Sequence, residues 1–238
     1  DEAYQARLRR AEYHYDVATS LSPNNAFLRN EWVKFHLEEG NLERAQEVVA
    51  DSLEIDPEYD ETWLLLGEVH RLQGDLAKAA EAYEQALELD PRQANIWQLL
   101  GEIYLQLERP TDAARAWTGL GDMYVDRDAF ADALEAYNQA RALGPNLPEA
   151  WAGTGDAYVG MKLLQEAVDA YEQALALAPD ADDAWEVHRA LADVYDLRGQ
   201  SDLAVSHVQE ALRLAPDEEQ PDLQARLTEL QTAEGMRP

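Results

Sequence analysis

Small and apolar residues recur along this chain at fixed distances. Four positions follow Trp63 at distances of 16, 20, 23 and 28 residues: Ala79, Tyr83, Ala86 and Pro91. The same distances separate Trp151 from Ala167, Tyr171, Ala174 and Pro179. Apolar positions that return every three or four residues are typical of amphipathic helices, and self-similarity over 34 residues is typical of a stacked repeat. The pattern therefore predicts a chain of short helices arranged in pairs.

Each 34-residue unit reads as two helices joined by a tight turn. Gly67 lies in the first helix of one unit, where the absence of a side chain lets the second helix approach closely. Gly74 and Asp75 lie between the two helices, where glycine can end a helix and aspartate can cap the next one. Pro91, which has no N–H to donate, marks the start of the following unit.

This spacing resembles the tetratricopeptide repeat, in which W-x2-L-G-x2-Y is followed by A-x3-Y/F-x2-A and then Pro. The resemblance implies an all-α solenoid, a right-handed superhelix of about 13 antiparallel helices. We expect one solenoid over residues 1–238, made of a half repeat at 1–24, repeats at 26–59, 60–93, 148–181 and 185–218, an irregular region at 94–147, and a capping helix at 219–232.

The irregular region is centred on Trp117, which fits two registers. Counted from Trp97 it occupies a second-helix position, and counted forward to Gly121 and Tyr124 it occupies a first-helix position. We expect one helix over residues 111–126 to serve both roles, weakened by Gly119 and Gly121. The loss of one helix would exchange the concave and convex layers and give an S-shaped solenoid.

Charge narrows the range of partners. The chain has 238 residues, with 48 Asp and Glu against 19 Lys and Arg, and a formal net charge of −29. A surface this negative repels nucleic acid and anionic lipid, so we expect neither nucleic-acid binding nor membrane insertion by this segment. Basic proteins or peptides fit better. The absence of Cys removes disulfides and thiolate chemistry but does not identify a compartment.

By resemblance, positions 5 and 9 of each unit point into a concave groove that binds extended peptides. Position 9 is occupied by Lys34, Glu68, Glu102, Asp122, Asp156 and Asp193, so five of the six residues are carboxylates. Position 5 includes Gln98 and Arg189. We call these position-5 and position-9 residues the ladder. Its carboxylates predict a groove that binds a basic peptide, while the alternative is a set of solvated helix faces. The family's carboxylate clamp uses Lys, Asn and Arg, and is not expected here.

No catalytic, metal or cofactor site is predicted. The five histidines, at positions 14, 36, 70, 188 and 207, lack the spacing of a metal motif, so structural or surface roles are expected. Asp126-Arg127-Asp128 is followed by Phe130 and Ala131, which do not continue a calcium loop. The chain also has no glycine-rich phosphate loop.

Three functions remain open. The first is a non-catalytic protein-interaction scaffold. The second is a solenoid that stacks end to end into a filament through an uncovered N-terminal stripe of Tyr4, Leu8, Ala11 and Tyr15. The third rests on the stretch from Leu21 to Trp32 and the segment from His188 to Tyr195, which loosely resemble the C-terminal repeat region of bacterial O-antigen ligase/polymerase-like membrane proteins. It implies a soluble bacterial segment, extracytoplasmic or tethered through missing N-terminal sequence.

Overall fold

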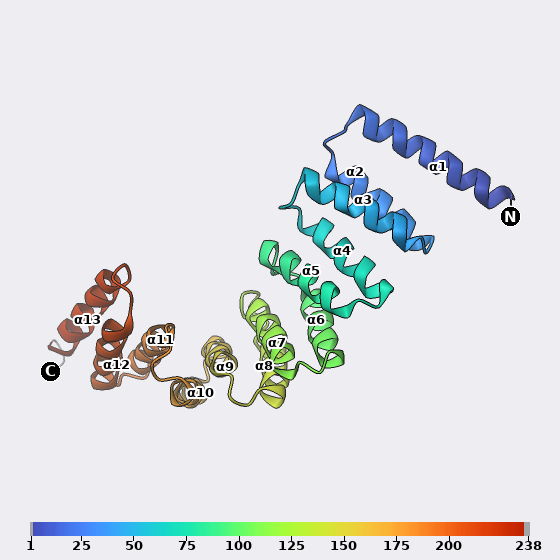
Figure 1. The fold of residues 1–238 in the computed structure, drawn as a ribbon. Coiled ribbons are helices and arrows are strands. Elements are labelled where there is room, and N and C mark those ends of the chain that lie inside the picture. The colour runs from blue at the N-terminus through green and yellow to red at the C-terminus, as the bar shows by residue number, and fades with distance from the viewer. Residues whose placement is uncertain (1, 236–238) are drawn as a thin grey trace. The chain divides into compact units, whose positions relative to one another are not determined.

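Residues 2–235 form thirteen α-helices joined by short turns in this computed structural model, and no strand occurs in that part of the chain (Figure 1). The expected all-α class is therefore confirmed. The structure describes residues 2–235, without the side chains of residues 3–5 and 233–235. The chain divides into two compact units, Asp1–Arg109 and Pro110–Pro238.

The first unit contains six helices: α1 Glu2–Leu21, α2 Ala26–Glu38, α3 Leu42–Ile55, α4 Asp60–Gln73, α5 Leu76–Leu89 and α6 Ala94–Gln106. Helices α2 and α3 pack as one pair, and α4 and α5 as the next. Helix α1 contacts α2, and α6 contacts α5.

The second unit contains seven helices: α7 Pro110–Val125, α8 Phe130–Leu143, α9 Pro148–Gly160, α10 Leu164–Leu177, α11 Ala184–Leu197, α12 Ser201–Leu214 and α13 Gln220–Gly235. Three helix pairs follow one another, α7 with α8, α9 with α10, and α11 with α12. Helix α13 packs on α12, and three of its leucines, Leu223, Leu227 and Leu230, are buried there.

The predicted turn residues act as expected between α4 and α5. Gly74 ends α4 with a φ of 82°, a left-handed conformation that glycine adopts without strain. Asp75 caps α5, because its side chain accepts a hydrogen bond from the backbone N–H of Lys78 at 3.3 Å. Trp63 adds a contact between neighbouring repeats of the first unit by donating from its indole N–H to the carbonyl of Pro57 at 2.8 Å.

A glycine of the first helix faces a tyrosine of the second in three helix pairs. A Cβ added at Gly67 would lie 2.5 Å from the ring of Tyr83, so the close packing of α4 on α5 requires glycine. The pairs Gly121–Tyr137 and Gly155–Tyr171 have the same arrangement. Gly121 thus gives α7 the contact of a first helix with α8. The sequence predicts one helix over residues 111–126, and α7 contains all of them except Asp126.

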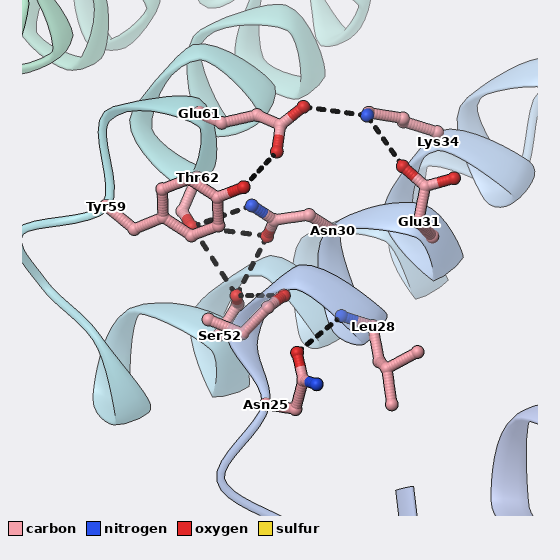
Figure 2. Close-up of polar contacts among 10 residues, drawn as sticks. Asn25, Leu28, Asn30, Glu31, Lys34, Ser52, Tyr59, Glu61 and Thr62 are labelled. Atoms are coloured by element: carbon pink, nitrogen blue, oxygen red, sulfur yellow. Dashed lines mark hydrogen bonds and ion pairs between the residues drawn. The ribbon is translucent and has the colours of Figure 1, made fainter. Parts of the chain in front are cut away.

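The pair α2–α3 belongs to a divergent repeat that lacks this glycine and tyrosine. A buried polar network holds it together (Figure 2). Asn30, Ser52 and Thr62 come from α2, α3 and α4, and none of them is exposed. The amide of Asn30 donates to the Thr62 hydroxyl at 3.0 Å, and the Ser52 hydroxyl donates to Asn30 Oδ1 at 2.8 Å. Val33 and Val49, both fully buried, replace the glycine and tyrosine of the other pairs.

Candidate functional site

An acidic groove lies in the second unit, between α7, α9 and α11. It has a volume of about 280 Å³. Its charged lining consists of Asp122, Glu149, Asp156, Asp183, Glu186 and Arg189, so five carboxylates face a single cation. Its apolar lining includes Ala152, Val187 and Ala190. We call this surface the acidic groove.

Two carboxylates of the groove are held by tyrosines of the second helices behind them. Tyr137 donates from its hydroxyl to Asp122 at 2.7 Å, and Tyr171 donates to Asp156 at 2.5 Å. Each carboxylate directly follows the glycine on which the tyrosine ring packs. The repeat pattern therefore fixes the glycine, the tyrosine and the carboxylate together, and it directs the carboxylate toward the groove.

The groove raises the pKa of both carboxylates. Asp122 and Asp156 still touch solvent, but the walls of the groove displace much of the water around them. Loss of hydration raises the pKa of Asp122 to about 6, although the hydrogen bond from Tyr137 opposes the rise. Negative charge on Asp156 and Glu149 adds to it. Desolvation also raises the pKa of Asp156, while the positive charge of Arg189 partly counteracts it.

Glu68 in the first unit has the same tyrosine contact but a different electrostatic setting. The hydroxyl of Tyr83 donates to it at 3.1 Å, and the guanidinium of Arg71 binds it through two hydrogen bonds of 2.6 and 2.7 Å. Hydrogen bonding to Arg71 holds the pKa of Glu68 below its ordinary value. Glu68 is thus neutralised within its own helix, whereas Asp122 has no comparable ion pair among the described contacts.

The remaining ladder positions also differ from one another. Gln98 and Glu102 are exposed one turn apart on α6, in the first unit. Asp193 on α11 is bound by Arg226 of α13, with a nitrogen–oxygen distance of 3.0 Å. Arg189 lines the acidic groove, and its guanidinium lies 5.2 Å from the centre of the Trp185 ring. The structure therefore brings together Asp122, Asp156 and Arg189 from the predicted set.

The N-terminal stripe lies differently from the prediction. Ala11 and Tyr15 pack on the core of the chain's own first unit, and the Tyr15 ring stacks on Trp32 with centroids 4.6 Å apart. Leu8 lines a small hollow beside Phe35. The side chain of Tyr4 lies outside the described residues. Ala11 and Tyr15 are half-buried against the core of the first unit, so they are not uncovered as expected, and a role of the stripe in self-association stays a prediction.

Two family models match the repeats. One, described as TPR repeat, matches residues 67–108 and 121–162, and the other, described as Tetratricopeptide repeat, matches residues 146–217. Together they cover more than half of the chain. The chain belongs to the tetratricopeptide repeat family. No curated protein matches it.

Several solved structures resemble this chain in fold. The Cut9–Hcn1 assembly of the APC/C is 22% identical, with a TM-score of 0.45 over 92% of this chain and 45% of that one, so this chain spans less than half of its length. MamA is 25% identical, with a TM-score of 0.42 over 68% and 97%. YrrB, described as a TPR protein with an unusual peptide-binding site, is 19% identical, with a TM-score of 0.40 over 85% and 93%.

Membership of the tetratricopeptide repeat family indicates a protein-interaction scaffold in general terms. Such repeats bind proteins or peptides and are typically non-catalytic. No helix among the described residues is long and apolar enough to cross a membrane. The looser resemblance to O-antigen ligase/polymerase-like proteins finds no support in these matches, and it stays a prediction.

Two of the five histidines lie side by side in the structure. The Nδ1 atoms of His188 on α11 and His207 on α12 are 2.9 Å apart. Within residues 2–235 no group of three or more His, Asp or Glu residues has a metal-binding arrangement. The pair therefore forms a hydrogen bond between two helices of one tetratricopeptide repeat.

Sequence reasoning missed Glu149, Asp183 and Glu186, which enlarge the acidic groove. They lie at or near the start of α9 and α11, outside the two positions that the family pattern singles out. A sequence signal existed for the tyrosines: each follows its carboxylate by 15 residues, as in Asp122–Tyr137 and Asp156–Tyr171.

Proposed function

We propose that this chain is an interaction scaffold whose acidic groove binds a basic segment of a partner protein. The observation that carries the proposal is the lining of the acidic groove, where five carboxylates face Arg189 as the only cation among the described lining residues. Asp122 is one of these carboxylates. Loss of hydration raises its pKa to about 6, and in the part of the chain that the structure describes its hydrogen-bond partner is the neutral hydroxyl of Tyr137. A Lys or Arg side chain would supply the missing positive charge.

The carboxylates of the groove are already positioned before a cation binds, which lowers the entropy cost of binding. Tyr137 and Tyr171 hold Asp122 and Asp156 in place, so little side-chain freedom is lost when a partner binds. The partly dehydrated groove also strengthens the attraction between the carboxylates and an incoming ammonium or guanidinium group. Ala152, Val187 and Ala190 offer apolar contact for the stem of a Lys or Arg side chain.

The other ladder residues have smaller proposed roles. Gln98 and Glu102 are exposed on α6 and could contact a partner of the first unit. Glu68 and Asp193 are already bound to arginines of this chain, so a partner would have to displace Arg71 or Arg226. We therefore propose that Asp122 and Asp156 contribute most, and that Arg189 helps to set the register of the bound segment.

Isothermal titration calorimetry tests this assignment. The probe is an octapeptide of alternating Arg and Ala with blocked ends, and its Glu–Ala counterpart is the charge control. Asp122→Asn combined with Asp156→Asn should weaken binding of the basic peptide about tenfold or more. Glu68→Gln is the matched control, because Glu68 has the same tyrosine contact but is paired with Arg71.

Two results would contradict the proposal: unchanged affinity in the double variant, or an equal loss in Glu68→Gln. Affinity of the unmodified chain should also rise between pH 5 and pH 7, because Asp122 ionises near pH 6. The double variant should show a much smaller change over this range.

A further inference from the structure

Helix α1 has an apolar face that the described part of the chain leaves exposed. Tyr13, Val17 and Leu21 follow one another at intervals of four residues, with exposed fractions of 65%, 39% and 79%. Intervals of four place them on one side of the helix. Ala11 and Tyr15, which pack on the core of the first unit, lie on the opposite side.

The second helices of the other repeats share only the last residue of this face, because the position of Leu21 is apolar in each of them. When they are aligned on the alanine that matches Ala11, the positions of Tyr13 and Val17 are polar in all five. The residues are Glu47 and Asp51 in α3, Glu81 and Gln85 in α5, Glu135 and Gln139 in α8, Asp169 and Gln173 in α10, and Ser206 and Glu210 in α12. Only α1 among these six helices presents apolar side chains where its counterparts are solvated, which indicates a contact surface.

Positive charge lies beside this face. Arg7, Arg9 and Arg10 are exposed and belong to one four-residue stretch of α1. The formal net charge of the whole chain is −29. Arg10 precedes Tyr13 by three residues and Val17 by seven, so it continues the apolar face toward the N-terminus of the helix. The surface is therefore apolar over its C-terminal half and basic at the other end.

We propose that this face of α1 binds the acidic groove of a second copy of the chain. Arg10 would enter between Asp122 and Asp156, while Tyr13 and Val17 would lie against the apolar lining that includes Val187. The proposal rests on the proposed function and names the basic segment as this chain's own helix. Charge complementarity selects this occupant, because the basic end of α1 meets a groove with five carboxylates.

A symmetric pairing of two α1 helices explains the observations less well. It would bury only the short stripe of three apolar residues on each copy. It would also bring the two arginine clusters into one small interface without using the carboxylates of the groove. Contact between α1 and the groove uses two different surfaces, so every bound copy leaves one of each free, and the assembly continues as an open chain or closes as a ring.

A complementation experiment tests this arrangement. Arg10→Glu reverses a charge on the α1 face and leaves the groove unchanged. Asp122→Lys reverses a charge in the groove and leaves α1 unchanged. Sedimentation velocity is measured at an ionic strength of about 0.15 M, where the Debye length is about 8 Å, so that the repulsion between two negatively charged copies is screened while close ion pairs persist. The unmodified chain should associate beyond a dimer as concentration rises, and each variant alone should remain monomeric. An equimolar mixture should form heterodimers and nothing larger, because the two surfaces left free in each heterodimer are the substituted α1 face and the substituted groove.

Two control variants test whether the effects come from the substituted surfaces. Arg44→Glu makes the same charge change on α3 of the first unit, and it should leave association unchanged. Glu186→Lys repeats the groove substitution at an exposed residue that also lines the groove, in case Asp122→Lys lowers the folded fraction.

The outcomes separate this inference from the proposed function. If the unmodified chain is monomeric at every concentration but still binds the Arg–Ala peptide, self-association is refuted and the proposed function stands. If the chain associates but the two variants do not complement each other, another interface is responsible and the inference is refuted. If neither the peptide nor a second copy binds, both proposals fail.

Discussion

Replacing Asp122 by Asn should stabilise the chain at neutral pH. Tyr137 can donate its hydroxyl hydrogen bond to the amide oxygen as it does to the carboxylate, so the shape of the site is kept. The folded state raises the pKa of Asp122 from 3.8 to about 6, and it therefore opposes ionisation. At about 1.4 kcal/mol per pH unit, the upper limit of this penalty is about 3 kcal/mol.

Solvent contact reduces that figure. Asp122 is exposed at the surface of the groove, and screening by water and salt lowers the expected gain in the free energy of unfolding to about 1 kcal/mol at pH 7. The sign depends on pH. A carboxylate whose pKa is raised on folding binds more protons in the folded state, so its stabilising effect is present at low pH and is lost as pH rises through about 6.

Urea denaturation followed by tryptophan fluorescence at pH 4, 5, 6, 7 and 8 measures the difference between the two chains. The difference should be near zero at pH 4 and should grow to its full value above pH 6. Glu102→Gln, at an exposed position of the other unit, serves as the control and should stay within about 0.5 kcal/mol of the unmodified chain throughout. A destabilised Asn variant at pH 7, or a difference that does not vary with pH, would refute the reasoning.

Three further outcomes follow from the packing. Gly121→Ala should lower the free energy of unfolding by about 1–2 kcal/mol because its methyl group would overlap the Tyr137 ring, whereas without that contact the change would raise it by up to about 1 kcal/mol; urea denaturation gives the sign. Asn30→Leu should destabilise by about 3 kcal/mol, measured in the same way, because it leaves two buried hydroxyl groups with fewer partners; a loss below 1 kcal/mol would contradict this. Burial lowers the pKa of His188 and His207, so their contribution is complete above pH 6.5 and is lost as pH falls below it; His207→Gln should flatten the decline in thermal midpoint between pH 7 and pH 5, and an equally steep decline would refute this.

The fold was largely predictable because its determinants are short-range. Glycine and tyrosine at a separation of 16 residues describe one contact between two helices of a pair, so the spacing from Gly67 to Tyr83 encodes packing directly. The helix predicted over residues 111–126 is observed at Pro110–Val125 for the same reason, since Gly121 must face Tyr137.

The electrostatics of the site were less predictable. Periodicity places Glu68, Asp122 and Asp193 at equivalent positions, but their partners come from long side chains whose direction no spacing fixes. Arg71 neutralises Glu68 from one turn away, and Arg226 reaches Asp193 from a helix 33 residues further along the chain. Only Asp122 of these three keeps its charge uncompensated among the described contacts.

The N-terminal helix was misread for a related reason. Ala11 and Tyr15 match the second-helix pattern, which suggested a face that lacks its first helix. In the structure Trp32 of α2 stacks on Tyr15 and leaves it half-buried. The pattern identified the helix but not the neighbour that a divergent repeat provides.

The pKa of Asp122 in the presence of a basic peptide tests the central claim most directly. Carbon-13 NMR titration of the side-chain carboxyl group, assigned by its loss in Asp122→Asn, should give a pKa of about 6 in the free chain. With the Arg–Ala octapeptide bound, the value should fall toward the ordinary range for aspartate, because an adjacent guanidinium favours the ionised carboxylate. A pKa that stays near 6 while the peptide is bound would show that the peptide binds elsewhere, and it would contradict the account.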